Sequence, residues 1–241
     1  MNIEGSVALV TGANRGLGRA FAEQLIARGA AKVYATARRP ETVTVPGVEV
    51  LALDVTDAAR ITEIASVTSD VTLLINNAGI QTGVSLVDGD VTALRDELET
   101  HLYGPLNLVR AFAPLLKENG GGAVLNVLSA LSWFGTPGAT AYHIAKASAW
   151  AMTNGVRLEL AEQGTLVTGL HLGMADTDMS AAYNGPKLPP KTVVDLALDG
   201  IEAGATEVLA DDWSRFVKSL LVEDPAVRDA RVFEALTGVM G

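Results

Sequence analysis

The sequence has no cysteine, which excludes disulfide bonds, thiolate metal sites and a cysteine nucleophile. Basic residues are also few, because 18 lysines and arginines stand against 28 acidic residues, for a formal charge of −10. They are dispersed along the chain and form no basic stripe of the kind that a phosphate backbone requires. Nucleic acid is therefore not expected as a partner, and the lack of cysteine is compatible with a cytoplasmic protein.

Long hydrophobic runs are also missing. The longest uncharged stretch, residues 119–145, is interrupted by three consecutive glycines and a Pro-Gly pair, so no membrane span is expected. The N-terminal residues MNIEGSVALVTGA have no basic region and only a short apolar run, which predicts no signal peptide. The three histidines, His101, His143 and His171, do not have metal-ligand spacing, so no catalytic metal is predicted.

Short apolar runs alternate with segments of helical periodicity along the whole chain. This alternation, without a break in composition, predicts a single α/β domain over residues 1–241 with a parallel, doubly wound sheet. Two long helices are expected at about 91–116 and 140–163. The predicted strands are residues 6–11, 31–36, 48–53, 71–76, 123–128, 165–172 and 207–210.

A glycine-rich segment, TGANRGLG at residues 11–18, follows the first predicted strand and opens a helix. Its glycines allow a tight turn, close approach of a diphosphate to the backbone, and close packing of helix on strand. The helix N-terminus then faces the anion. An ordinary strand-to-helix turn is the alternative, but the placement predicts nucleotide binding. The residues of this turn expected to bind the cofactor are Gly12, Asn14, Arg15, Gly16, Leu17 and Gly18.

The end of the second predicted strand indicates which dinucleotide is bound. An NAD site places a carboxylate there for the ribose 2′-hydroxyl, whereas this chain has Ala37, Arg38 and Arg39 and no acid before Glu41. An arginine fork binds a 2′-phosphate, so NADP(H) is predicted, with Arg15 as a second cation within reach. The alternative is that these arginines are ordinary solvated surface residues.

Further motifs follow the later strands in a fixed order. They are Asp54-Val55 after the third strand, Asn76-Asn-Ala-Gly79 after the fourth, Ser129 after the fifth, and Tyr142-x-x-x-Lys146, with Ser129 13 residues before Tyr142. Together with the glycine turn, these motifs resemble the short-chain dehydrogenase/reductase family over nearly the whole chain. The resemblance implies a Rossmann fold with strand order 3-2-1-4-5-6-7 and an NADP-preferring enzyme similar to carbonyl reductases.

The same resemblance implies further contacts to the cofactor. Asp54 and Val55 would flank the adenine, and Thr177 would bind the carboxamide or diphosphate. Asn76 is expected to hold the sheet together and not to be catalytic. The remaining cofactor residues expected by analogy are Asn77, Ala78, Gly79, Gly173 and Ala175, with Tyr142 and Lys146.

Tyr142 and Lys146 lie four positions apart, so on a helix both side chains face the same ligand. A free phenol has a pKa of about 10, and a nearby ammonium is expected to lower it toward neutral pH. In this interpretation, Tyr142 gives a proton to the carbonyl oxygen that accepts hydride at carbon, and Ser129 orients that oxygen. In similar enzymes, the lysine also holds the ribose hydroxyls. The alternative is an exposed helical pair without chemistry.

Two positions depart from the family pattern. His101 stands where such enzymes usually have an asparagine that holds a relay water, so it is either a member of a proton relay or a packed histidine. Leu172 stands where a proline is common, before the retained Gly173. His143 is expected at the surface or an interface, and His171 in the core.

The substrate is predicted to be a bulky or aromatic carbonyl compound, or the corresponding alcohol. Trp133 and Phe134 are candidates for an apolar wall, with core packing or a subunit contact as the alternatives. Residues 174–190 contain many helix breakers and are predicted to form a substrate lid. In the family, the two long helices pair between subunits, so a homodimer or homotetramer is expected.

Two other functions compete with the reductase. One is an NADP-binding sensor or scaffold without catalysis, which the complete set of Ser129, Tyr142 and Lys146 argues against. The other is a relative that breaks carbon-halogen bonds without a dinucleotide, which would have no use for the glycine turn or for Arg38.

Overall fold

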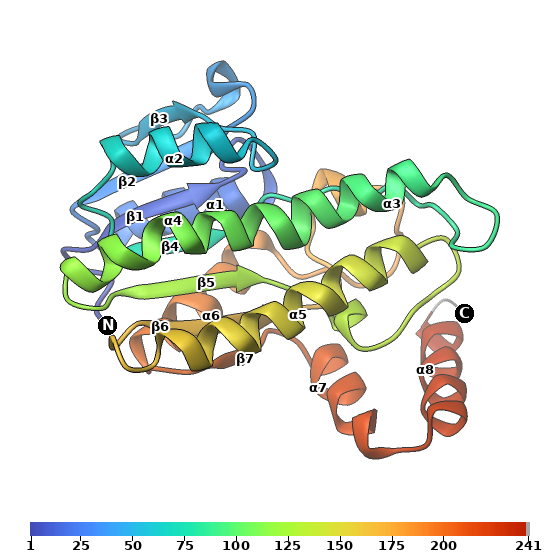
Figure 1. Ribbon diagram of the computed structural model, residues 1–241. Helices are drawn as coiled ribbons and strands as arrows, with labels where there is room; N and C mark the ends of the chain where they lie inside the picture. Colours follow the sequence, from blue (N-terminus) through green and yellow to red (C-terminus); the bar gives the residue numbers. More distant parts are fainter. Residues whose placement is uncertain (240–241) are drawn as a thin grey trace.

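The computed structural model describes residues 1–239 as a seven-stranded parallel sheet with helices on both faces (Figure 1). The strands lie in the order β3-β2-β1-β4-β5-β6-β7, which confirms the predicted fold class. They are β1 (Val7–Thr11), β2 (Lys32–Ala37), β3 (Glu49–Ala52), β4 (Leu73–Asn76), β5 (Ala123–Val127), β6 (Leu166–His171) and β7 (Glu207–Leu209).

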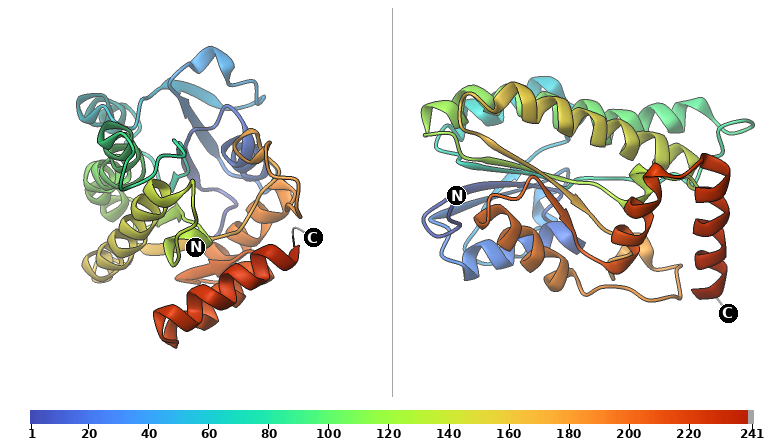
Figure 2. Two further views of the ribbon diagram at one scale, coloured as in Figure 1. Left: turned by 90° about the vertical axis from the view of Figure 1, so that its right-hand side faces the viewer. Right: turned by 90° about the horizontal axis from the view of Figure 1, so that it is seen from below.

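The helices form two layers around this sheet, as the right panel of Figure 2 shows. Helices α1 and α6 cover one face, and α2, α4 and α5 cover the other. The α-helices are α1 (Gly16–Ala27), α2 (Ala58–Val67), α3 (Val91–Leu98), α4 (Gly104–Glu118), α5 (Thr140–Leu160), α6 (Pro190–Glu202), α7 (Asp212–Ser219) and α8 (Pro225–Val239). Short helical turns are η1 (Pro40–Thr42), η2 (Glu99–Tyr103), η3 (Ala130–Ser132), η4 (Asp178–Ser180) and η5 (Leu220–Val222).

The sheet is buried on both faces, which explains why its strands are continuous apolar runs. In β1, Ala8 and Val10 pack in the core formed with α1 and α6, whereas Leu9 packs in the core formed with α2, α4 and α5. Successive side chains of a strand point to opposite faces of the sheet, so one strand contributes side chains to both cores. Phe21 of α1 and Phe112 of α4 are fully buried anchors of the two layers.

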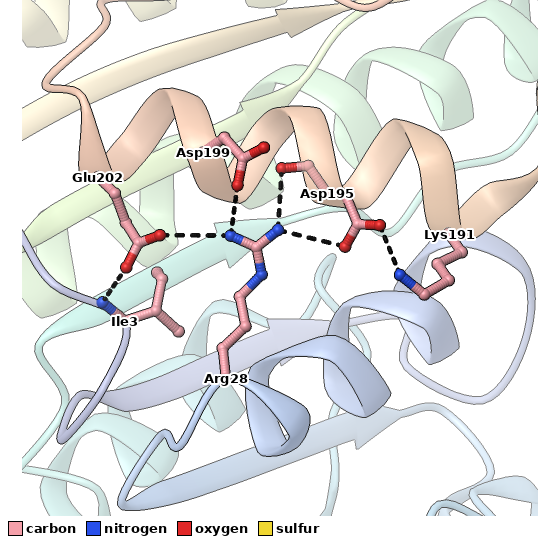
Figure 3. Close-up of polar contacts among 6 residues, drawn as sticks. All are labelled: Ile3, Arg28, Lys191, Asp195, Asp199 and Glu202. Carbon is pink, nitrogen blue, oxygen red and sulfur yellow. Dashed lines mark hydrogen bonds and ion pairs between the residues drawn. The ribbon is translucent and has the colours of Figure 1, made fainter.

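Polar contacts also join α1 to α6 (Figure 3). Arg28, at the end of α1, donates to the carboxylates of Asp199 at 2.6 Å, Asp195 at 3.2 Å and Glu202 at 3.3 Å. The other oxygen of Glu202 accepts from the backbone N–H of Ile3 at 3.1 Å. The N-terminal segment and two helices are thus held together at the edge of one layer.

The long helix expected at 91–116 is not continuous. It consists of α3, one π-helical turn (η2) and α4, whereas the second expected helix is α5. A π-turn inserts one extra residue into a helix and is frequent at functional sites. Gly104 follows this turn, where a Cβ would lie 2.7 Å from the carbonyl oxygen of Val55. Every helix within residues 1–239 is too short or too polar to span a membrane.

Candidate active site

A large cleft of about 1480 Å³ lies at the carboxyl ends of the strands. In an open parallel sheet, ligands bind in this place, outside the ends of the strands where the chain order reverses. The cleft is lined by residues that follow β1 through β6 and by residues of α5, α7 and α8. With one exception, described below, every predicted cofactor or catalytic residue lines this cleft.

The glycine turn follows β1 and forms the floor of the cleft. Gly12 and Gly16 have φ values of +66° and +54°, which favour glycine. A Cβ at Gly12 would lie 3.0 Å from the Cα of Ala78, so the turn lies directly against the segment after β4. Thr11 Oγ1 joins the two segments, because it accepts from the N–H groups of Asn77 at 2.9 Å and Ala78 at 3.0 Å. A diphosphate can therefore approach the backbone and the start of α1 without meeting a side chain.

Gly18 is the exception among the predicted cofactor residues, since it does not line the cleft. It lies behind the turn, where a Cβ would be 2.1 Å from the carbonyl oxygen of Gly12 and 2.5 Å from Asn77 Nδ2. Its contribution is the close packing of α1 on β1.

The arginines predicted for a 2′-phosphate follow β2, the strand that pairs with β1 beside the glycine turn. Arg38 and Arg39 line the cleft directly after β2, are exposed, and have no ion-pair partner among the described residues. Arg15 also lines the cleft, where its Nη1 lies 3.2 Å from Asp178 Oδ2. Both side chains of this pair are largely exposed, so the contact contributes at most about 1 kcal/mol and yields easily to another anion.

Asp54 and Val55 form the neighbouring part of the rim after β3. The Asp54 carboxylate accepts from the N–H of Thr56 at 3.0 Å and from its hydroxyl at 2.8 Å. This turn holds the carboxylate in place beside the cleft.

Ser129, Tyr142 and Lys146 meet in the middle of the cleft. Ser129 follows β5 as the N-cap of η3, and its Oγ accepts from the N–H of Leu131 at 3.1 Å. Lys146 is buried; its Nζ donates to the carbonyl oxygen of Val127 at 2.8 Å and lies 5.5 Å from the centre of the Tyr142 ring. The segment after β5 and the first turns of α5 thus contribute these three side chains to one cleft.

The electrostatics of this pair differ from the expectation. Burial, with a smaller contribution from the Glu97 carboxylate, raises the pKa of Tyr142 above its usual range instead of lowering it. Burial lowers the pKa of Lys146 to about 7, and Glu97 opposes that shift. The Lys146 ammonium donates to the carbonyl oxygen of Val127, and no hydrogen bond among the described residues joins it to the Tyr142 hydroxyl.

His101 lies in the π-turn η2 and lines the same cleft. Its Nε2 lies 2.7 Å from the carbonyl oxygen of Ile80, and its ring meets the edge of Tyr142 at a centroid distance of 5.2 Å. Burial and the charge of Lys146 lower the pKa of His101 well below its usual range, so the imidazole is neutral at neutral pH. With its proton on Nε2, the ring donates to the carbonyl oxygen of Ile80 and has a lone pair on Nδ1; with the proton on Nδ1, Nε2 accepts from the N–H of Ile80 at 3.2 Å. Gly79 makes room for this ring, since a Cβ there would lie 2.6 Å from His101 Cε1.

Asn76 has the structural place expected of it. Its Nδ2 donates to Asn126 Oδ1 at 2.8 Å, and Asn126 donates to Thr153 Oγ1 at 2.9 Å. The chain of contacts joins β4, β5 and α5 behind the cleft.

The segment after β6 covers the cleft from another side. Gly173, Ala175 and Thr177 all line it, and the N–H of Gly173 donates to Asp211 Oδ2 at 2.7 Å. Leu172, at the atypical position, is buried, and its carbonyl oxygen accepts from the N–H of Ala130 at 2.9 Å. Leu172 therefore packs in the core, and the backbone of Gly173 lines the cleft.

The wide end of the cleft beyond Tyr142 is mostly apolar. Phe134 lines it, whereas Trp133 is buried in the core and stacks on His171 with 4.0 Å between ring centres. His171 Nδ1 is 3.0 Å from the carbonyl oxygen of Ser129, and burial lowers its pKa to about 4. His143, which was expected at the surface or an interface, is partly buried, with Nδ1 2.7 Å from the carbonyl oxygen of Leu131.

Sequence reasoning missed two sets of residues at this site. Glu97 of α3 is fully buried beside the predicted acid-base pair, and the only hint was a carboxylate on a helix face that is otherwise turned inward. The second set is on the two C-terminal helices, which no motif connects to the cleft. Its members are Trp213, Phe216, Ala235 and Leu236.

Known proteins resemble this chain over most of its length. Residues 6–187 match the profile of the short chain dehydrogenase family. A short chain dehydrogenase from Burkholderia cenocepacia, solved in complex with NADP, is 40% identical and superimposes with a TM-score of 0.91 over 96% of this chain and 99% of its own.

Curated relatives include a 3-oxoacyl-(acyl-carrier-protein) reductase of Vibrio harveyi, 32% identical over 76% of this chain and 79% of its own length. An uncharacterized oxidoreductase of Staphylococcus saprophyticus is 28% identical over 84% of this chain and 93% of its own length. The predicted family and the prediction of a nicotinamide cofactor agree with these similarities. The chain belongs to the short-chain dehydrogenase family of oxidoreductases, which use nicotinamide cofactors.

Proposed function

We propose that the protein is an NADPH-dependent carbonyl reductase, which can also run in reverse as an alcohol dehydrogenase. The observation that carries this proposal is that Ser129, Tyr142 and Lys146 line one cleft with the glycine turn and Arg38. A sensor or scaffold would need the turn and the arginine, but it would not need three side chains suited to proton transfer at a carbonyl oxygen.

The residues present fit NADP(H). A cleft of about 1480 Å³ begins at a turn in which a side chain would meet neighbouring backbone at Gly12 and the Thr177 side chain at Gly16. Arg38, after the neighbouring strand β2, would hold the 2′-phosphate, and Lys146 would hold the ribose hydroxyls. The binding of NADP by the related Burkholderia protein supports this choice.

The chemistry follows from the side chains in the middle of the cleft. When bound, NADPH supplies a hydride to the carbonyl carbon. The hydroxyl of Ser129 donates to the carbonyl oxygen and orients it, and Tyr142 gives that oxygen a proton. A phenol with a raised pKa stays protonated at neutral pH, which suits its use as an acid in the direction of reduction. A positive charge on Lys146 stabilises the phenolate that results.

We propose that His101 returns the proton to Tyr142. It touches the ring of Tyr142, is neutral at neutral pH, and has one ring nitrogen free of the backbone contact to Ile80. A neutral imidazole accepts a proton at one nitrogen and releases one at the other, so it can replace the relay asparagine.

The proposed substrate is a bulky or aromatic ketone or aldehyde. The wide end of the cleft is walled by Phe134, Trp213, Phe216 and Leu236, and an apolar pocket of this kind binds rings better than phosphates. Lys187 also lines the cleft, but it faces Asp176 at 3.8 Å. The Asp176 carboxylate partly offsets the charge of this one lysine, while the aromatic and aliphatic walls favour a neutral substrate.

The segment 174–190 is proposed to act as a lid over this substrate. Backbone hydrogen bonds join the two ends of this segment. The N–H of Asp176 donates to the carbonyl oxygen of Leu188, and the N–H of Leu188 donates to that of Met174, both at 2.8 Å. The Arg15–Asp178 pair ties it loosely to the glycine turn. We also propose that the single-domain chain works in the cytoplasm as a homodimer or homotetramer that pairs α4 and α5 between subunits.

The test is the oxidation of NADPH, with NADH in parallel, against a panel of aromatic ketones, aldehydes, diketones and quinones. Turnover that prefers NADPH and falls by about 10²- to 10⁴-fold in Tyr142→Phe is expected, since general acid help is typically of that size. Calorimetric titration with NADPH is the matched binding measurement. Tight binding without turnover would support the sensor instead, and no binding would refute the proposal.

A further inference from the structure

One buried carboxyl group and one buried amine act on the same tyrosine, Tyr142. Among residues 1–238, Glu97 is the only buried carboxylate and Lys146 the only buried ammonium or guanidinium, with 0% and 5% of their surfaces exposed. Glu97 comes from α3 and Lys146 from α5, helices that lie side by side (Figure 1). A buried charge is expensive unless it is compensated, so these two residues have a reason to lie in the same region.

Glu97 has an uneven set of partners. Its Oε1 accepts two hydrogen bonds from Thr82, from the N–H at 2.7 Å and from the hydroxyl at 2.5 Å. Its Oε2 is buried and has no hydrogen-bond partner among the described residues. Both donors are neutral groups of Thr82, so no positively charged donor binds this carboxylate directly.

The contact to Thr82 also fixes a segment beside the substrate end of the cleft. His101 binds the backbone of Ile80, and Glu97 binds Thr82, so two side chains of the α3-η2 region hold one short stretch of chain. Ile80 and Gln81, within that stretch, line the cleft.

We propose that Glu97 is a positioning residue that serves as the buried counter-charge of Lys146, keeps that amine protonated, and anchors residues 80–82 beside the substrate. Its catalytic consequence rests on the proposed function, because Lys146 assists Tyr142 only as a cation. The charge coupling itself does not depend on that function.

The electrostatic directions agree with this placement. Burial lowers the pKa of Lys146 to about 7, and the charge of Glu97 is the contribution that opposes it. Lys146 is therefore near half-protonation at neutral pH, where loss of an adjacent negative charge changes its protonation most. Glu97 also raises the pKa of Tyr142, so removal of its charge lowers the proton affinity of both partners.

Among the titratable groups near Tyr142 and Lys146, Glu97 is the one acidic side chain that is buried in the described residues. His101 is neutral at neutral pH, and the remaining charged side chains of α3 and of the loop before it are exposed and therefore screened by water. The titratable groups on α5, η2, α3, the loop before α3 and β6 include Tyr142, His143, His101, Glu99, Arg95, Asp96, Asp88, Asp90 and His171.

The test measures the pKa of Lys146 by NMR of the protein carrying ¹³Cε-lysine, without any cofactor. The chain has six lysines, and the resonance of Lys146 is assigned from its loss in Lys146→Arg. Glu97→Gln keeps an oxygen acceptor for Thr82 but removes the charge, and it should lower the pKa of Lys146 by at least about half a unit. Thr82→Val is the matched control, which removes the hydroxyl contact, keeps the charge, and should leave the pKa of Lys146 unchanged.

An unchanged Lys146 pKa in Glu97→Gln, or an equal shift in Thr82→Val, would overturn the proposal. If Glu97→Gln does not fold, ¹³Cδ-glutamate NMR of the unaltered protein decides. The proposal then requires an ionised Glu97 whose resonance responds at the titration midpoint of Lys146, and a protonated Glu97 refutes it.

The pH profile of kcat/KM provides the link to catalysis. Its apparent pKa values should move down in Glu97→Gln by the shift seen for Lys146, whereas Thr82→Val should alter KM without moving them. A merely structural role for Glu97 would lower activity at every pH and leave the profile in place. Because the NMR measurement needs no turnover, failure of the reductase function and failure of the Glu97 coupling are distinguishable.

Discussion

Replacing Gly18 with alanine tests the close packing between α1 and the glycine turn. A Cβ at this position would lie 2.1 Å from the carbonyl oxygen of Gly12 and 2.5 Å from Asn77 Nδ2, whereas real Cβ contacts are essentially never under 3.0 Å. Asn77 cannot simply rotate away, because its Nδ2 donates to the carbonyl oxygen of Thr11 at 2.8 Å. The start of α1 must therefore move by roughly 1 Å relative to β1.

The expected magnitude combines two opposing effects. Alanine favours a helix over glycine by about 1 kcal/mol, and overpacking a tight contact typically costs about 1–3 kcal/mol. Because the obstacle is backbone, we expect the upper end of that cost and a net loss of about 2 kcal/mol in the free energy of unfolding. The affinity for NADPH should fall about 10- to 100-fold, since α1 presents its N-terminus to the diphosphate.

Gly155→Ala is the matched control. Gly155 lies within α5, and a Cβ there meets nothing within 4 Å. The same substitution should therefore stabilise the protein by about 0.5–1 kcal/mol and leave NADPH affinity unchanged. Urea unfolding and calorimetric titration of both variants provide the comparison. Equal stability of the two variants would refute the packing argument, and unchanged NADPH affinity in Gly18→Ala would refute the coupling of this contact to the cofactor.

Three further predictions concern the cofactor, the relay and the core. Arg38→Asp should weaken NADPH by more than about tenfold and NADH only slightly, as measured by binding titrations, and equal losses would contradict the placement of the 2′-phosphate. His101→Ala should lower kcat about tenfold or more, with a smaller loss in His101→Asn, whereas an unchanged kcat across pH would assign the ring to packing alone. His171 has a pKa of about 4 in the fold against about 6.5 when unfolded, so its contribution is complete above pH 6.5 and is lost as pH falls toward 4. Urea unfolding at pH 7 and pH 4 should show about 3 kcal/mol more loss in the unaltered protein than in His171→Gln, and equal losses would show that His171 is not the group that titrates.

The sequence by itself determined the sheet and the position of the site. Strands buried on both faces must be continuous apolar runs, so all seven could be located to within two residues. The polar motifs stand directly after those runs, and parallel strands place their carboxyl ends at one edge. Asp54, Ala78 and Ser129 were therefore expected in one cleft, and they line one.

Tertiary structure alone decided the features that depend on contacts between distant segments. No local sequence pattern marks the π-helical turn η2. The turn lies where Gly104 approaches the backbone of Val55, a residue far away in the sequence. The pKa of Tyr142 is raised, whereas the sequence predicted that Lys146 would lower it. Burial and the Glu97 carboxylate raise this pKa, and the Lys146 ammonium donates to the carbonyl oxygen of Val127. Hydrophobic period locates an element and its inward face, but the free energy of a charge depends on what the fold brings next to it. For that reason, Glu97 and the walls contributed by α7 and α8 could be found only in the folded chain.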